Sequence, residues 1–299
     1  MNKISKSYRL FTIFNTIFMV LVLLVCIVPY FHTLAKALND GYDTMLGGLT
    51  IYPRKPTMQN FQVLLSDSSM YLAFLVSIAK VVLGTVLGLL VQFAAAYALS
   101  KETLRGKSAI MLFLIIPTFF SGGTIPTYLL YSNSGLINNF WVYVLPHLAS
   151  YYNILIIKSY IGSSVPYSLR EAASLDGASE MRTMLQIVFP LCKPVMATVA
   201  LWIAVSQWNN YTDTLYYITN ESLATLSYKL MQIVQESERL KALIQEAALM
   251  GENITDAVKS TPESLVAAQV IVTTIPIIVV YPFLQKYFVK GVTLGAVKA

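Results

Sequence analysis

Five long stretches of this 299-residue sequence contain no Asp, Glu, Lys or Arg, and they limit what the chain can fold into more than any other feature. They are residues 10–35, 81–100, 108–157, 194–212 and 264–285. A helix needs about 20 apolar residues to cross a bilayer, so each stretch can supply a membrane-spanning helix. Charged residues make up 12% of the chain and the mean hydropathy is +0.61, whereas soluble domains carry about 25% charged residues. The composition therefore excludes an ordinary soluble enzyme.

The stretch 108–157 must turn back on itself. It has 50 residues, and as a single helix it would be about 75 Å long, more than twice the thickness of the hydrocarbon layer. The turn is expected at 132–135, where the sequence reads Ser-Asn-Ser-Gly. We therefore expect an all-α polytopic membrane protein that forms a single domain over residues 1–299. Its six spans are expected at about 10–34, 70–99, 108–131, 138–159, 194–217 and 264–288.

The first apolar stretch follows three basic residues, as a signal peptide would. Its apolar core of about 24 residues is too long for a cleaved signal, so we expect a retained span. An even number of spans places both termini on one side of the membrane. The large loops on the opposite side are then about 35–69 and 218–263, and the second has the apolar periodicity of an amphipathic helix.

Basic residues decide which side is cytoplasmic, because Lys and Arg are retained on the inner face whereas acidic residues matter little. The segments on the side of the termini hold 13 of the 21: Lys3, Lys6, Arg9, Lys101, Arg105, Lys107, Lys158, Arg170, Arg182, Lys193, Lys286, Lys290 and Lys298. The opposite loops hold seven, and Lys80 lies within the second span. We predict that both termini are cytoplasmic. The net charge of +6 then reflects membrane topology and gives no reason to expect nucleic-acid binding.

The long internal loop at about 160–190 contains a short helix followed by a sharp turn. Ser164 and Pro166 are typical of a helix start, and Gly177, about three turns later, is typical of a helix stop. The adjacent small residues Ala172 and Ala173 would let another protein surface approach closely. The sequence thus predicts a docking segment at the inner face of the membrane.

This loop reads Glu171-Ala172-Ala173, two further residues, Asp176-Gly177-Ala178 and, later, Pro190. The pattern resembles the membrane-spanning permease subunits of binding-protein-dependent ABC importers. The resemblance implies the type I ABC importer permease fold, with this loop as a coupling helix in a groove of a separate ATPase subunit. The coupling residues that it implies are Arg170, Glu171, Ala172, Ala173, Asp176, Gly177 and Ala178.

The resemblance also implies that ATP and Mg²⁺ bind to the partner ATPase pair and that this chain holds no cofactor. The nearest approach to a phosphate-binding loop is Gly106-Lys107-Ser108, but the first glycine of that motif is replaced by Lys101. The chain is therefore expected to be a transport subunit and not an enzyme.

The carboxyl-terminal tail, 285–298, and the sequence Trp208-Asn209 resemble the second, shorter permease of maltose-type carbohydrate importers. One departure is that the acidic residue which usually follows soon after the Asn appears only at Asp213. The implied partners are a second, homologous permease, an ATPase pair and an external or periplasmic sugar-binding protein, in a bacterial cytoplasmic membrane. Permeases for amino acids or phosphate, and less so a secondary transporter driven by an ion gradient, remain alternatives.

A sugar pathway needs aromatic faces and amides, and the fifth span supplies both. The candidates are Trp202, Gln207, Trp208, Asn209 and Asn210. Polar amides in a span are costly unless they face a partner or a water-filled path. The alternative is that the amides bond to neighbouring helices and that the tryptophans lie at the membrane interface.

Five other positions in the spans have simpler interpretations. Lys80 is expected to extend its amine to the membrane surface. His32 and His147 are isolated, with no metal-ligand spacing, so no metal site is expected. Gly84 and Gly88, four residues apart, are expected to allow close helix packing.

Overall fold

The computed structural model describes residues 6–249 and 261–296, and apart from loops and one isolated bridge these residues are helical. Contacts divide the chain into two compact units, Met1–Met70 with Leu230–Ile275 and Tyr71–Lys229 with Pro276–Ala299. The first unit contains α1 (Lys6–Ala37), α2 (Gly41–Met45) and α3 (Gln59–Ser66). Residues of α13 (Leu226–Leu249) and α14 (Pro262–Ala296) belong to both units.

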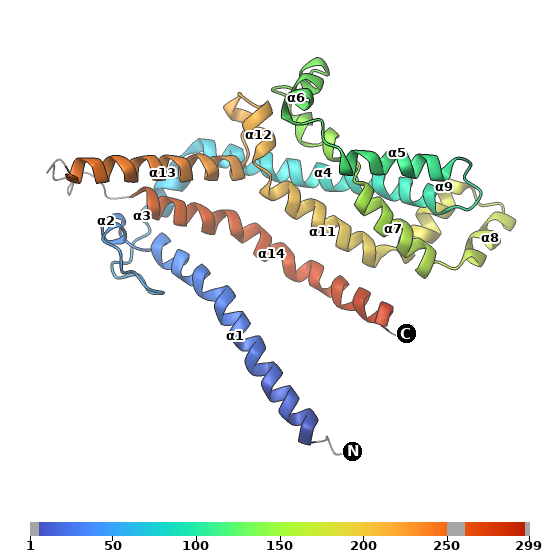
Figure 1. The fold of residues 1–299 in the computed structure, drawn as a ribbon, viewed down its shortest axis with the longest axis horizontal. Helices are drawn as coiled ribbons and strands as arrows, with labels where there is room; N and C mark the ends of the chain where they lie inside the picture. Colours follow the sequence, from blue (N-terminus) through green and yellow to red (C-terminus); the bar gives the residue numbers. More distant parts are fainter. Residues whose placement is uncertain (1–5, 250–260, 297–299) are drawn as a thin grey trace. The chain divides into compact units, whose positions relative to one another are not determined.

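The second unit contains nearly all of α4 and the shorter helices that follow α4 in the chain (Figure 1). In chain order they are α4 (Ser68–Ser100), α5 (Lys107–Phe119), α6 (Thr124–Asn133), η1 (Phe140–Tyr143), η2 (Leu145–His147), α7 (Tyr151–Ser164), α8 (Tyr167–Leu175), α9 (Glu180–Arg182), the π-helical η3 (Thr183–Val188), α10 (Phe189–Leu191), α11 (Lys193–Asn209), α12 (Thr212–Tyr217) and η4 (Glu221–Leu223).

Three helices are long and apolar enough to cross a membrane unbroken: α1, α4 and α14. Three further segments qualify only as bent pairs, namely α5 with α6, η1–η2 with α7, and α9–α10 with α11. The described chain therefore offers up to six spans if each bent pair is counted as one.

The expected continuous helix over 108–131 is divided in the structure. α5 ends at Phe119 and α6 starts at Thr124, with an angle of 118° between them. The break follows from the sequence Ser-Gly-Gly, since Gly123 has φ +86° and ψ 176°, a conformation that only glycine adopts easily. The chain turns back at Gly135, where φ is +68°.

The expected helix over 138–159 also begins differently. Two short 3₁₀ turns, η1 and η2, precede α7 and meet it at 47°. Pro146 lies in η2, and Ser150 caps α7 by accepting a hydrogen bond from the Asn153 N–H. Residues 138–150 of the second unit are therefore not α-helical, and they lead into α7 through two short turns.

The core of the second unit lies between α4, α7 and α11. It includes Phe93 of α4, Ile157 of α7 and Val199 of α11, each at most 2% exposed. Between membrane helices this packing stabilises mainly through dispersion, because lipid tails are as apolar as the side chains. Gly84 and Gly88 allow the close approach of α4 to α11, as expected: a Cβ on Gly84 would lie 3.2 Å from Gln207 Nε2, and one on Gly88 would lie 3.6 Å from Ile203 Cδ1.

The first unit is ordered by buried amides in the segment after α1. Asn60 is fully buried, and its Nδ2 donates to the carbonyl oxygens of Ala37 and Asn39 at 2.9 Å each. Its Oδ1 accepts from Ser264 Oγ at 2.9 Å, which joins this segment to the start of α14. The amphipathic segment expected within 218–263 forms α13 over Leu226–Leu249.

Candidate functional site

The end of α8 depends on a hydrogen-bond pattern that requires glycine. The Ala178 N–H donates to the Ala173 carbonyl at 2.9 Å, and the Gly177 N–H donates to the Ser174 carbonyl at 3.1 Å. These two bonds form a Schellman motif, in which the residue at position 177 must be left-handed, and Gly177 has φ +74°. The sequence spacing from the Ala pair to Asp-Gly-Ala is therefore the spacing that the hydrogen bonds at the end of this helix require.

Nearly all of α8 is accessible on its surface. Leu175 is 89% exposed, and Tyr167 and Leu169 are also exposed. Only Ala173 is buried, because it faces the rest of the unit. A short helix that exposes leucine and small residues in this way is suited to insertion into a groove on another protein.

Arg170 connects α8 to the end of α4. Its Nη1 donates to Ser100 Oγ at 3.2 Å, and its guanidinium lies 5.5 Å from the ring centroid of Tyr167. The arginine side chain thereby links the exposed helix to the last residue of a membrane-spanning helix.

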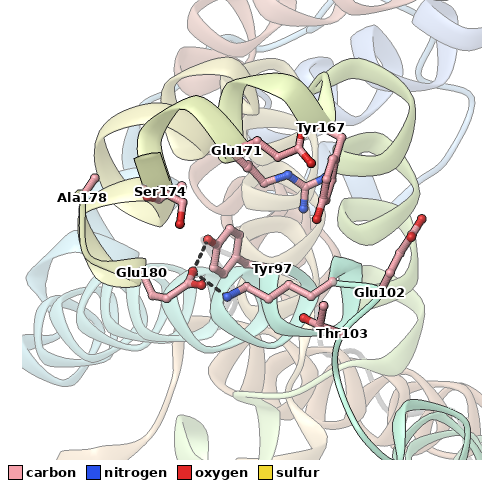
Figure 2. Close-up of a pocket in the computed structure, with 11 residues that line it drawn as sticks. Tyr97, Glu102, Thr103, Tyr167, Glu171, Ser174, Ala178 and Glu180 are labelled. Atoms are coloured by element: carbon pink, nitrogen blue, oxygen red, sulfur yellow. Dashed lines mark hydrogen bonds and ion pairs between the residues drawn. The ribbon is translucent and has the colours of Figure 1, made fainter. Parts of the chain in front are cut away.

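Glu180, at the start of α9, makes a second connection to α4. Its Oε2 accepts a hydrogen bond from Tyr97 Oη at 2.7 Å and pairs with Lys101 Nζ at 2.5 Å, as Figure 2 shows. The bond from Lys101, and then the bond from Tyr97, hold the pKa of the Glu180 carboxyl below its usual range. The carboxylate is therefore charged at neutral pH and, together with Arg170 of α8, it ties the two sides of the Gly177 turn to α4.

A cavity of about 190 Å³ lies between α8, α9 and the end of α4. Basic and acidic side chains line it, among them Lys101, Arg170, Glu171 and Glu180. The small residue Ala178 also lines it. In Figure 2 the Tyr97 hydroxyl and the Glu180 carboxylate point toward each other within this cavity.

The residues expected to couple to the ATPase have three different surroundings. Arg170, Glu171 and Ala178 line the cavity, whereas Ala173 packs inward. Ala172, Asp176 and Gly177 are exposed on α8 and its turn. Sequence reasoning missed Tyr97, Ser100, Lys101 and Glu180, because their contacts join positions 70 or more residues apart.

A larger cavity, of about 410 Å³, lies among α4, η2, α7 and α11. Aromatic rings and amides make up much of its wall: Gln92, His147, Tyr152, Asn153, Trp202, Gln207 and Asn210. None of its lining residues is Asp, Glu, Lys or Arg. The rings of Tyr152 and Trp202 lie with centroids 6.1 Å apart.

Two buried amides of this cavity have unused acceptors. Gln92 Nε2 donates to the Leu148 carbonyl at 3.0 Å, and Gln207 Nε2 donates to the Tyr143 carbonyl at 3.2 Å. The Oε1 atoms of both glutamines are buried with no hydrogen-bond partner among the described residues. Buried acceptors are costly when left unpaired, so each glutamine has the capacity for one more hydrogen bond.

The five residues expected in the pathway are separated by the structure. Trp202, Gln207 and Asn210 line the larger cavity. Trp208 packs against Phe74 of α4 with ring centroids 6.3 Å apart. Asn209 is exposed, and its Nδ2 donates within α11 to the Val205 carbonyl at 2.9 Å.

The expectation that Lys80 extends to the membrane surface is wrong. Its side chain is 1% exposed, and Nζ donates to the Asn210 carbonyl at 2.9 Å and lies 3.8 Å from Asp213 Oδ2. The physical reason is the break between α11 and α12, which leaves a carbonyl and a carboxylate facing the amine. His147 is not isolated either, since Nε2 lies 2.9 Å from Asp213 Oδ2.

No cluster of three or more His, Cys, Asp or Glu suited to a metal ion occurs in the part of the chain that the structure describes.

Comparison with known proteins agrees with this arrangement. Residues 5–294 match the family described as the binding-protein-dependent transport system inner membrane component. The chain is 31% identical to the polygalacturonan/rhamnogalacturonan transport system permease protein YtcP of Bacillus subtilis, over 97% of this chain and 99% of that protein. It is 32% identical to protein LplC of the same organism, over 98% of this chain and 97% of that protein.

A solved structure has a similar fold. It is a chain of a bacterial ABC transporter involved in the import of the acidic polysaccharide alginate, with a TM-score of 0.82 and 26% sequence identity. The match covers 96% of this chain and all of that one. The helical breaks and the exposed α8 thus occur within the type I permease fold, and this chain belongs to the family of inner membrane components of binding-protein-dependent transport systems, a transport component and not an enzyme.

Proposed function

We propose that this chain forms half of the pathway by which an ATP-driven importer takes up an oligosaccharide. The observation that carries the proposal is the larger cavity, whose lining combines the rings of Tyr152 and Trp202 with several side-chain amides. Rings can stack on the C–H faces of a sugar while the amides bond to its hydroxyls. The names of the relatives point the same way, since they include permeases for polygalacturonan, raffinose and maltose.

The second part of the proposal concerns partners. A second, homologous permease supplies the other half of the pathway, and an external sugar-binding protein delivers the sugar. α8 docks in a groove of a separate ATPase subunit, where the exposed Leu175 and the small Ala172 meet the partner surface. ATP and Mg²⁺ bind to that ATPase pair, and both termini of this chain lie in the cytoplasm.

Purification of a tagged copy in mild detergent tests the assembly. We expect a second six-helix permease and an ATPase to co-purify in fixed ratio. With the matching binding protein added in proteoliposomes, raffinose, maltose, trigalacturonate and an alginate trisaccharide are the sugar probes, and glutamine and phosphate represent the other solute classes. Stimulation of ATP hydrolysis by at least one sugar, and by neither glutamine nor phosphate, would support the proposal. Stimulation by phosphate or glutamine alone would contradict it.

A further inference from the structure

Among the described side chains of the second unit, Lys80 is the most deeply buried charge, and it lies beside the end of α11. The last carbonyls of a helix lack partners within the helix and carry a partial negative charge. Lys80 Nζ donates to one of them, that of Asn210, at 2.9 Å. It also lies 4.8 Å from the ring centroid of Tyr143, which adds a cation–π contact.

Asp213 lies in the first turn of α12, directly after the break, where a negative charge is favourable. Its Oδ2 accepts from Asn210 Nδ2 at 2.9 Å, pairs with Lys80 at 3.8 Å and lies 2.9 Å from His147 Nε2. We call Lys80, Asp213 and His147 the charge cluster. It joins α4, η2 and α12 at one point.

If the charge cluster served only to pack helices together, burying it would be costly in free energy. Burying two charges requires desolvation that their attraction often does not repay, and apolar residues of similar size are frequently as stable. Ionisable groups within a membrane-spanning region therefore usually have a role in function. The arrangement of the cluster indicates which member has that role.

His147 is the most exposed member of the charge cluster. Its side chain is 39% exposed, against 1% for Lys80 and 11% for Asp213. It lines the larger cavity together with Asn210, whereas Lys80 and Asp213 do not. A carboxylate can only accept hydrogen bonds, so Nε2 carries the hydrogen that is shared with Asp213, and in the neutral imidazole Nδ1 is then the acceptor.

We propose that His147 is a sugar-binding residue of the larger cavity, and that Asp213, neutralised by Lys80, positions its imidazole. The inference rests on the proposed function and adds a residue of the binding site. Nδ1 accepts from a sugar hydroxyl. The ligand class is a sugar recognised through its hydroxyl groups, since no Asp, Glu, Lys or Arg lines the cavity.

The test uses the complete importer in proteoliposomes and measures sugar taken up per ATP hydrolysed, with the four sugar probes named above and saturating binding protein. We expect His147→Ala to lower uptake per ATP by about threefold to tenfold, as for one lost hydrogen bond. His147→Gln, which keeps a donor for Asp213 and an acceptor for the sugar, should recover most of the uptake. His32→Gln is the matched control, because His32 is the other histidine of the chain and bonds to the Thr50 carbonyl instead.

The positioning residues need a separate readout. Asp213→Asn keeps the shape but leaves Lys80 buried without its counter-charge, so we expect weakened assembly together with reduced uptake per ATP. Lys80→Met leaves Asp213 unbalanced, so poor assembly is expected, and the double variant Lys80→Met/Asp213→Asn should restore assembly but not uptake. A purely structural cluster would instead recover both in the double variant, and this result would overturn the positioning role.

Two further outcomes separate this inference from the proposed function. If His147→Ala transports the sugar at the wild-type ratio, or if His147→Gln is as impaired as His147→Ala, the sugar-binding role is wrong while the proposed function stands. If the wild-type importer takes up none of the four sugars, the proposed function is contradicted and this inference is overturned with it.

Discussion

At the scale of single residues, Glu180 gives a direct test of how movement passes from α8 to the membrane. Glu180→Gln removes the charge that Lys101 pairs with but keeps an acceptor for Tyr97. Because the carboxylate is largely exposed, the pair contributes only about 0–1 kcal/mol to stability. We therefore expect near-normal thermal stability and a fall of about twofold to fivefold in sugar uptake per ATP hydrolysed, measured in proteoliposomes.

The control for this prediction is Glu102→Gln, a residue that lines the same cavity without a described bond to α9. pH provides a second check. The pKa of Glu180 is lowered in the folded state, so its ion pair is complete above the usual carboxyl value of 4.5 and is lost as pH falls through the lowered value. Coupling should thus be unchanged between about pH 6 and pH 8. A Glu102→Gln variant that is equally impaired would contradict a specific role for Glu180.

At this scale the sequence predicts local geometry where that geometry depends on a short pattern, as at residues 171–178, whereas the coupling role of these residues stays a prediction. The residues 171–178 end α8 through bonds between near neighbours, so their spacing is visible in the sequence. The expectation for Lys80 is wrong because its hydrogen-bond and ion-pair partners lie 130 residues or more away. Separations of 83 and 66 residues likewise conceal the pairing of Glu180 with Tyr97 and of His147 with Asp213.

At the scale of elements, the turn after α8 supplies the second prediction. Gly177 has φ +74° and open space around the position of a Cβ, so a substitution there is opposed by backbone strain alone. Gly177→Val should cost about 1–2 kcal/mol in the local structure of the turn, and Gly177→Asn should cost less because asparagine tolerates this conformation. We expect the valine variant to insert normally but to uncouple ATP hydrolysis from uptake.

The chain offers a matched control for that variant. Gly162 in α7 also has open space around a Cβ, but its backbone conformation suits any residue. Gly162→Ala should leave uptake per ATP unchanged or raise stability slightly, as alanine favours helix. Normal coupling in Gly177→Val would show that α8 is not the coupling helix.

The packing of α4 on α11 supplies a third prediction. A Cβ on Gly84 would lie 3.2 Å from Gln207 Nε2, so Gly84→Ala must displace the amide that lines the larger cavity. A Cβ on Gly88 would make only ordinary contacts, the nearest at 3.6 Å. We expect Gly84→Ala to lower sugar uptake per ATP by more than twofold and Gly88→Ala to have little effect. Equal effects of the two variants would argue that Gln207 does not contact the sugar.

Hydropathy predicted the long helices better than the broken ones. α1, α4 and α14 are long, apolar and continuous, although α1 contains Pro29 and α14 contains Pro276 and Pro282. The division of 107–133 at residues 120–123, and the 3₁₀ turns over 140–147, depend on glycine conformation and local capping. Hydropathy averaged over a window of residues does not detect these local signals, although Pro117, Gly122 and Gly123 are present in the sequence.

At the scale of the whole molecule, the distribution of charge leads to a prediction about the two faces of the membrane. Thirteen basic residues lie in the segments on the side of the termini and seven in the longer segments opposite, so the first set should be cytoplasmic. This places α8 where an ATPase can reach it and the segment after α1 where a binding protein can. Two exposed side chains report on this directly: Leu175, 89% exposed, and Tyr52, 73% exposed.

Single cysteines at these positions make the prediction measurable. In a background with Cys26→Ser, since Cys26 is exposed and Cys192 is buried, we expect a membrane-impermeant maleimide to label Tyr52→Cys in intact cells. Leu175→Cys should react only after the membrane is opened, and addition of the purified ATPase should then protect it, because α8 would be covered. Labelling of Leu175→Cys from outside would reverse the topology and remove the physical basis for ATP coupling through α8. Labelling from inside without protection would keep the topology but place the ATPase contact elsewhere on the inner face.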